Sequence, residues 1–166
     1  MTNGLTDAGR ALIEHACNRL VLESVAANDR QDFDAFAALF TPDGVLRRPA
    51  GEPLIGREAI VESYRDRAVD RITRHLCANV LIDVDSAESA RGVTLVLLYS
   101  ASATAKADRQ YGVPANSRRL LGEFEDVFRL TPEGWRIAAY TLHVTSSFGN
   151  RHVLAMATRR AAARSA

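Results

Sequence analysis

The first third of the chain has apolar residues at helical spacing. They recur every three or four positions between residues 6 and 27, as Leu12, Ala16, Leu20 and Val21. This pattern predicts a long amphipathic helix, with Thr6 as its N-cap. Asp32 has the same capping role ahead of a short second helix that is expected to end at Phe40. A third helix is expected from about Arg57 to Asp70.

The rest of the chain has the alternation and turn signals of extended strands. Four long strands are predicted, at residues 73–85, 90–105, 118–130 and 135–147. A shorter strand at 44–48 follows a turn signal at 41–44, and residues 53–55 are expected to return as its hairpin partner. On the first long strand, alternation places His75, Cys77 and Asn79 on one face and Arg74 on the other.

The order of these elements indicates the fold class. Helices come first and a run of long strands joined by short turns follows, which is typical of an α+β protein with a mainly antiparallel sheet. One face of a sheet this large must be buried, and the three N-terminal helices are the elements that can cover it. Helices against a curved sheet enclose a cone, whose mouth is a natural ligand pocket.

Composition bounds the class of protein. The chain has 166 residues and is 47% hydrophobic, which suits one folded domain over 1–166, with a core at about 8–148 and a C-terminal tail at 149–166. A formal net charge of +1 provides no field toward nucleic acid or an anionic membrane, and neither is expected as a partner. The two cysteines lack a paired motif, and no secretion signal or membrane span is apparent, so we expect a reduced, cytoplasmic protein.

Common catalytic motifs are missing from the sequence. Neither a dinucleotide-binding glycine fingerprint nor a phosphate-binding loop follows a predicted strand, and no nucleophile elbow is present. No two of the four histidines have the spacing of metal ligands on one helix. We therefore expect no cofactor and no metal site.

Four segments, in the same order, resemble the SnoaL-like domains of the nuclear transport factor 2-like superfamily. Residues 28–44 (NDRQDFDAFAALFTPDG) resemble the passage from the first helix to the first strand, and three further segments follow: Gly56 to Ile60, Arg74-His75 with Asn79, and Gly134 to Ile137. The likeness covers about residues 8–148. It implies a cone-shaped, cystatin-like α+β barrel in which three helices cover the concave face of the sheet. It also implies a homodimer or higher homo-oligomer formed through the open face of the sheet.

The resemblance also implies a candidate catalytic pair. The dehydratase and dehydrochlorinase branch of the superfamily uses an aspartate at the end of the first helix and a histidine near the start of the central strand. Asp29 and His75 occupy those positions here. A carboxylate that holds one imidazole nitrogen protonated leaves the other free to remove a proton from carbon. The simpler alternatives are that Asp29 only ends a helix and that His75 is a hydrogen-bonded core residue.

Candidate residues for contacting a substrate come from the same placement. His143, at the far end of the last strand, is a candidate second acid, and Tyr64, Asn79 and Tyr99 are candidate hydrogen-bond donors. The full set of candidate substrate-binding residues is Phe36, Phe40, Tyr64, Cys77, Asn79, Tyr99, Phe124 and His143. Dehydratases of this branch often have tyrosines near the aspartate, but Ser24, Val25 and Ala26 precede Asn28-Asp29 here, so a tyrosine on that helix is missing.

The leading functional hypothesis is a cofactor-independent lyase, such as a dehydratase, or an isomerase that acts by proton abstraction. Its expected substrate is an apolar cyclic or polyketide-like small molecule. One alternative is a non-catalytic ligand carrier or partner subunit of the same fold, in which Asp29 and His75 lie out of hydrogen-bonding reach of each other. Another alternative is a polyketide cyclase or an epoxide hydrolase. Function has to be argued from the site, because the fold hosts all of these.

Overall fold

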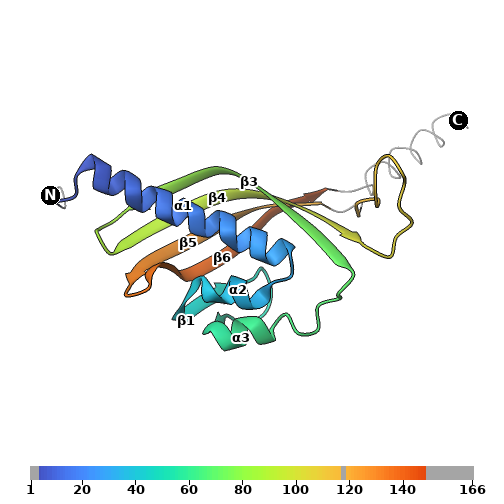
Figure 1. The fold of residues 1–166 in the computed structure, drawn as a ribbon, viewed down its shortest axis with the longest axis horizontal. Coiled ribbons are helices and arrows are strands. Elements are labelled where there is room, and N and C mark those ends of the chain that lie inside the picture. The colour runs from blue at the N-terminus through green and yellow to red at the C-terminus, as the bar shows by residue number, and fades with distance from the viewer. Residues whose placement is uncertain (1–3, 117–118, 149–166) are drawn as a thin grey trace, which may run out of the picture.

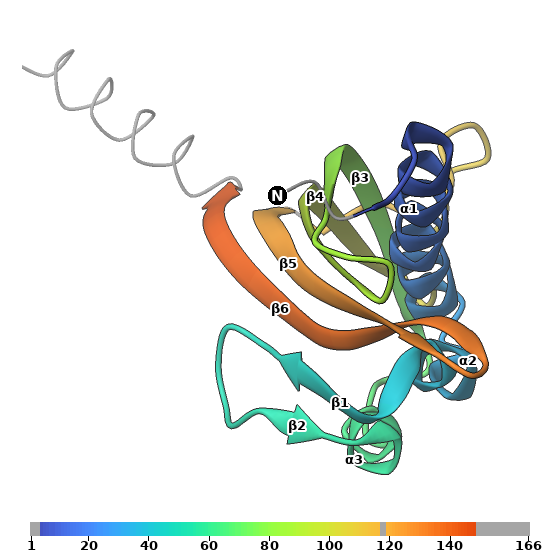
Figure 2. The same cartoon turned by 90° about the vertical axis from the view of Figure 1, so that its left-hand side faces the viewer.

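The computed structural model describes residues 4–116 and 119–148, and the C-terminal tail expected at 149–166 lies outside this part of the chain. Six strands form one curled sheet in the order β2-β1-β6-β5-β4-β3. Every neighbouring pair is antiparallel except β1 and β6, which run parallel. Helix α1 lies across the concave side of the long strands, with α2 and α3 below it (Figures 1 and 2). The predicted α+β cone is confirmed.

The helices begin where the sequence supplies caps. Helix α1 (Asp7–Asp29) is capped by Thr6, whose side chain accepts a hydrogen bond from the backbone of Gly9. The side chain of Asp32 caps α2 (Phe33–Ala38) in the same way, through the backbone of Ala35. Helix α3 (Arg57–Glu62) follows Gly56, which has a φ of 86°.

Four long strands carry most of the sheet. Their bounds are β3 (Arg71–Val84), β4 (Ser89–Ser102), β5 (Arg119–Thr131) and β6 (Gly134–Phe148). They form a meander, because each pairs with its neighbour in the chain. The short strands β1 (Phe40–Arg47) and β2 (Leu54–Ile55) extend the sheet beyond β6 as the predicted hairpin.

Two predicted boundaries are wrong. The third helix ends at Glu62 instead of Asp70, and residues 63–70 form turns that lead into β3. The turn signal at 41–44 lies within β1, where the pairing with β6 shifts its register between Phe40 and Val45. A bulge can absorb proline and glycine without ending a strand.

The core lies between α1 and the concave face of the sheet. The largest fully buried side chains are mainly aromatic and branched aliphatic: Phe36, Phe40, Phe124, Phe128, Ile60, Ile137 and Val21. Burying such side chains contributes roughly 1.5–3 kcal/mol each. One acidic residue, Asp126, is also buried in this region, with 3% of its surface exposed. Among the described residues, none of the helices combines the length and apolar character of a membrane span.

Candidate active site

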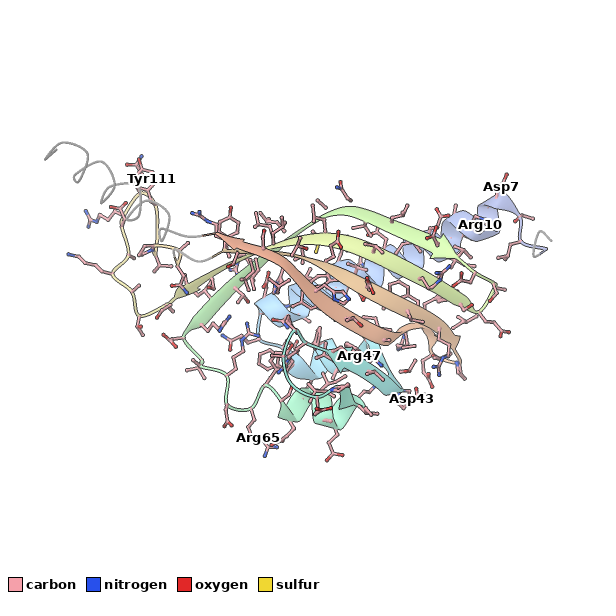
Figure 3. The ribbon with its side chains drawn as sticks, turned by 180° about the vertical axis from the view of Figure 1, so that it is seen from behind. Asp7, Arg10, Asp43, Arg47, Arg65 and Tyr111 are labelled. Carbon is pink, nitrogen blue, oxygen red and sulfur yellow. The ribbon has the colours of Figure 1, made fainter. Side chains whose placement is uncertain are left out.

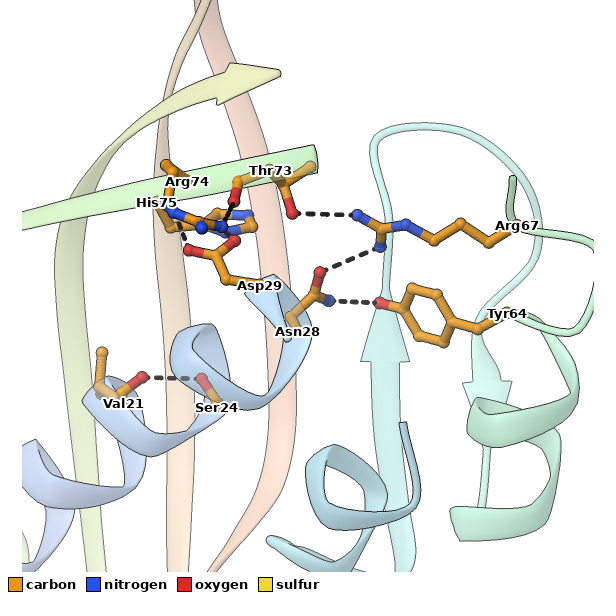
Figure 4. Close-up of polar contacts among 9 residues, drawn as sticks. All are labelled: Val21, Ser24, Asn28, Asp29, Tyr64, Arg67, Thr73, Arg74 and His75. Carbon is orange, nitrogen blue, oxygen red and sulfur yellow. Dashed lines mark hydrogen bonds and ion pairs between the residues drawn. The ribbon is translucent and has the colours of Figure 1, made fainter. Parts of the chain in front are cut away.

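Asp29 and His75 meet inside the cone. Asp29 is the last residue of α1, and His75 lies on β3 with its side chain on the concave side. One carboxylate oxygen, Oδ1, lies 2.6 Å from the ring Nδ1 of His75, and the other, Oδ2, accepts the backbone N–H of His75 at 2.9 Å. Both side chains are only 14% exposed. Figure 4 shows the two residues in contact, although 46 positions separate them in the chain.

This contact selects the imidazole tautomer. An ionised carboxylate can only accept hydrogen bonds, so Nδ1 of His75 carries the proton that Asp29 binds. The other nitrogen, Nε2, is then the one that can accept a proton. Burial lowers the pKa of His75 below its ordinary 6.5, although Asp29 opposes that shift. The imidazole is therefore neutral at pH 7, as a general base requires.

A cavity of about 510 Å³ opens beside this pair. Its apolar lining comes from α2 and the sheet and includes Phe36, Leu98, Phe124, Tyr140 and Leu142. Its polar lining comes from the turns after α3 and the start of β3, and includes Arg67, Arg71 and Thr73. A small apolar recess of about 20 Å³ lies against the same histidine, where Val96, Leu120 and Gly122 contribute to the wall. The volume of the cavity is within the range of small-molecule sites.

A chain of hydrogen bonds forms one wall of the cavity. The guanidinium of Arg67 donates to Oδ1 of Asn28 at 3.0 Å and to the hydroxyl of Thr73 at 3.2 Å. The amide of Asn28 donates in turn to the hydroxyl of Tyr64 at 3.0 Å (Figure 4). The Tyr64 ring stacks on Phe33, with centroids 4.3 Å apart. Arg67 thus links Asn28, which precedes Asp29, to Thr73, which lies two positions before His75.

Several predicted substrate-binding residues lie at or near this cavity. Phe36, Tyr64 and Phe124 line it. Phe40 does not line the cavity; it is fully buried in the core beside Phe36, with the two ring centroids 5.3 Å apart. Cys77 packs against the core from β3, and burial raises the pKa of its thiol to about 11, which does not favour a nucleophilic thiolate.

Three other candidates lie away from the cavity. Asn79 is exposed at a bulge in β3, with a φ of 50°, so the prediction that it faces the same space as His75 is wrong. Tyr99 pairs with the outward-pointing Arg74, which places it on the outer face of the sheet. His143 is half exposed and lies beside Glu125 on that outer face, with its Nε2 3.3 Å from a carboxylate oxygen, so it is not placed to act as a second acid.

The cavity also contains residues that sequence reasoning missed. Tyr140 lines it because a bulge in β6 shifts the pairing between Ile137 and Ala139, which turns both Ile137 and Tyr140 inward. Asn28 and Arg67 line it as well. The position of Asn28 next to Asp29 could have identified it from the sequence. Arg67 lies in an irregular turn, where no periodic pattern predicts which way a side chain points.

Asp126 is a second buried acid, deeper in the cone. It lies on β5 between Phe124 and Phe128 and directly opposite Tyr140 on β6. Neither carboxyl oxygen has a hydrogen-bond partner among the described residues. Burial raises its pKa to about 8, so the carboxyl is largely neutral at pH 7. In the described part of the chain, no group of three or more His, Cys, Asp or Glu side chains is arranged to hold a metal ion.

An α+β cone that encloses a hydrogen-bonded His–Asp pair beside a cavity defines a class of small-molecule-binding proteins. The sequence profile of the SnoaL-like domain matches residues 9–141, and the chain belongs to this family. A search of curated protein sequences found no match.

Solved structures share the fold. A protein proposed to be a scytalone dehydratase, from Novosphingobium aromaticivorans, is 19% identical with a TM-score of 0.73, over 87% of this chain and 91% of that one. A type 2 hexachlorocyclohexane dehydrochlorinase (LinA) is 13% identical with a TM-score of 0.72, over 87% and 93%. ActVI-ORFA from Streptomyces coelicolor is 19% identical with a TM-score of 0.64, over 80% and 97%. These likenesses establish the nuclear transport factor 2-like fold of the chain.

Proposed function

We propose that the protein is a cofactor-independent lyase or isomerase that removes a proton from a carbon atom of a cyclic or polyketide-like substrate. In this proposal, Nε2 of His75 accepts the proton, and Asp29 orients the ring and stabilises the imidazolium that forms. The observation that carries the proposal is the 2.6 Å contact between Nδ1 of His75 and Oδ1 of Asp29 at the wall of a cavity. A positioned base of this kind contributes about 10²–10⁴ in rate.

The surroundings of the pair support the same chemistry. Loss of a proton from carbon leaves negative charge on the substrate, and the Arg67 guanidinium beside the cavity is a donor that can stabilise it. The apolar lining from Phe36 and Phe124 lowers the polarity beside His75, which strengthens the electrostatic interactions there. If the carbon next to the carbanion bears a halide, the electron pair forms a double bond and the halide leaves. If that carbon bears a hydroxyl, the imidazolium of His75 returns the proton to the oxygen and water leaves. If no leaving group is present, return of the proton at another carbon gives isomerisation.

A non-catalytic carrier is less well supported. That alternative expects Asp29 and His75 to lie out of reach of each other, and the two side chains are in hydrogen-bond contact. A polyketide cyclase remains a second candidate, because aldol ring closure also begins with proton removal from carbon. The same pair would perform that step, so the two candidates differ in substrate and not in base.

The test uses bicyclic β-hydroxyketones, whose dehydration creates a conjugated enone that absorbs in the near ultraviolet. Deuterium uptake at the α-carbon, followed by NMR in D₂O, detects proton removal even when no group leaves. We expect His75→Gln to reduce either rate by about 10²–10⁴ and Asp29→Asn to reduce it strongly. His143→Gln is the matched control, because His143 lies on the outer face and should keep full activity. Unchanged turnover in His75→Gln would overturn the proposal.

Two further expectations complete the proposal. We propose a homodimer or higher homo-oligomer that forms through the outer face of the sheet, because partly exposed apolar side chains gather there: Leu76, Val93 and Val127. We also propose a cytoplasmic location, because the chain has two cysteines and both are free.

A further inference from the structure

The charged groups that line the cavity are unevenly distributed. Three arginines, Arg48, Arg67 and Arg71, contribute to its wall, against one acidic residue, the exposed Asp66. The chain as a whole is nearly neutral, with a formal net charge of +1, so this excess is local. Arg67 is half-buried and carries its charge where solvent screens it poorly.

None of these three arginines makes an ion pair with a described residue. Arg48 donates to the hydroxyl of Ser63 at 2.8 Å and lies over the Tyr64 ring, 4.5 Å from its centroid. Arg67 donates to the neutral Asn28 and Thr73, and its buried Nε has no hydrogen-bond partner among residues 4–116 and 119–148. Asp29 attracts Arg67 at longer range, but both of its oxygens bind His75.

The arginines also repel one another. Burial is the main cause that lowers the pKa of Arg67, and the charges of Arg71 and Arg48 lower it further. A half-buried guanidinium with two like-charged neighbours and only neutral acceptors is in an unfavourable environment. An anion placed between the guanidinium groups would relieve the repulsion and satisfy donors that the protein leaves unpaired.

A second space beside His75 is apolar, and it shares Leu98, Phe124 and Leu142 with the cavity. The recess beside the ring is formed by side chains without charge: Val96, Leu98, Leu120, Phe124, Leu142 and Val144, together with Gly122. The imidazole therefore borders both an arginine-lined space and an apolar recess. A ligand that spans the two would present its middle atoms to His75.

We propose that the natural ligand is an amphiphilic small molecule with a ring system and a carboxylate, in which the carboxylate binds among Arg48, Arg67 and Arg71. Its apolar ring packs against Phe124 and reaches toward the recess. Its identity as a substrate rests on the proposed function, but its binding mode does not. A carboxylate suits the site because guanidinium groups bind its two oxygens in a planar, bidentate geometry.

The test compares two probes that differ in charge and scarcely in shape, 2-naphthoate and 2-naphthamide, by isothermal titration calorimetry at pH 7 with the full chain. We expect 2-naphthoate to bind at least about tenfold more tightly, with an affinity that falls as salt is added. Equal affinity for the two probes, or no binding of 2-naphthoate, would overturn the inference.

Variants then locate the anion. We expect Arg67→Gln and the exposed Arg71→Gln each to weaken 2-naphthoate binding by about tenfold while leaving 2-naphthamide unchanged. Arg67 is half-buried, so its variant can fold poorly; the Arg71→Gln variant keeps the test valid in that case. The control is Arg74→Gln, because Arg74 is an exposed arginine on the outer side of the same strand. An equal loss of 2-naphthoate affinity in Arg74→Gln would show a general charge effect and overturn the assigned site.

The same titrations separate this inference from the proposed function. The His75→Gln variant should still bind 2-naphthoate more tightly than 2-naphthamide, because its three cavity arginines are intact. If charge selectivity is present and turnover does not depend on His75, the carboxylate site stands and the catalytic proposal fails. If turnover depends on His75 and the two probes bind equally, the catalytic proposal stands and the carboxylate site fails.

Discussion

Asp29 binds His75 at two points: Oδ2 accepts the backbone N–H of His75, and Oδ1 contacts the ring Nδ1. The backbone contact fixes the carboxylate against β3, and the ring contact then fixes the plane of the imidazole. Because the acid comes from the end of α1 and the base from β3, the edge strand of the sheet, the pair forms only when helix and sheet are packed.

The protonation of His75 provides the first prediction. Its pKa lies below 6.5 because burial disfavours the imidazolium, so activity that needs the neutral ring is lost only as pH falls through this lowered pKa. Asp29 favours the imidazolium, so Asp29→Asn should lower the pKa of His75 further. NMR titration of the ring nitrogens measures both values without a substrate. His143→Gln should leave them unchanged, and a His75 pKa at or above 6.5 would contradict the argument.

The buried Asp126 predicts a pH-dependent stability. Burial raises its pKa from 3.8 to about 8, so between these values the native state keeps a proton that the unfolded chain releases. The free energy of unfolding therefore falls by about 1.4 kcal/mol per pH unit across that window, and the loss is complete above about pH 8. Asp126→Asn cannot ionise, so its stability relative to the natural chain should rise from pH 5 to pH 8.

Urea unfolding at several pH values measures this difference. Asp83→Asn is a suitable control, since Asp83 is exposed on β3. Parallel stability curves for Asp126→Asn and the natural chain would show that the carboxyl is not buried in its protonated form.

The Tyr64 hydroxyl predicts a small structural effect. Tyr64→Phe removes the acceptor for the Asn28 amide and keeps the ring that stacks on Phe33. The expected loss in unfolding free energy is about 0.5–1.5 kcal/mol, the net value of one hydrogen bond. Thermal or urea unfolding checks it against Tyr99→Phe, a tyrosine on the outer face that should change little. A loss of equal size in the two variants would argue against the contact.

The outer face of the sheet predicts self-association. Figure 3 views the sheet from the side opposite to α1. If this face forms a dimer, light scattering should give about twice the chain mass of 18.1 kDa. Val127→Arg, which places a charge on an apolar position that is 42% exposed, should shift the protein to monomer. The control is Leu12→Arg, because Leu12 is 71% exposed on α1. A monomeric natural chain would end this proposal.

The sequence predicts most of the fold because its local signals agree with the tertiary structure. Thr6 and Asp32 cap the helices they were expected to cap, and the four long strands lie within a few residues of their predicted positions. The contact between Asp29 and His75, in contrast, has no local signal in the sequence. It came from the resemblance to a family, because residues 46 positions apart carry no local signal of contact.

Alternation fails wherever a strand is bulged. A bulge near Asn79 and another near Ala138 each add one residue to a strand, which reverses the faces of all later positions. This is why Asn79 and His143 were expected inside and Tyr140 was missed. Asp126, in contrast, shares strand parity with the buried Phe124 and Phe128, a pattern that could have identified it as a buried acid.

Residues 64–69 contribute Tyr64, Asp66 and Arg67 to the cavity wall, and side chains attach this segment to neighbouring elements. Arg67 binds Asn28 and Thr73, Tyr64 binds Asn28, and the side chain of Gln31 donates to the backbone carbonyl of Val69. These contacts can separate without disturbing any strand pairing. Local opening of this segment would therefore break only a few amide, hydroxyl and guanidinium contacts, at far lower cost in free energy than unfolding the barrel.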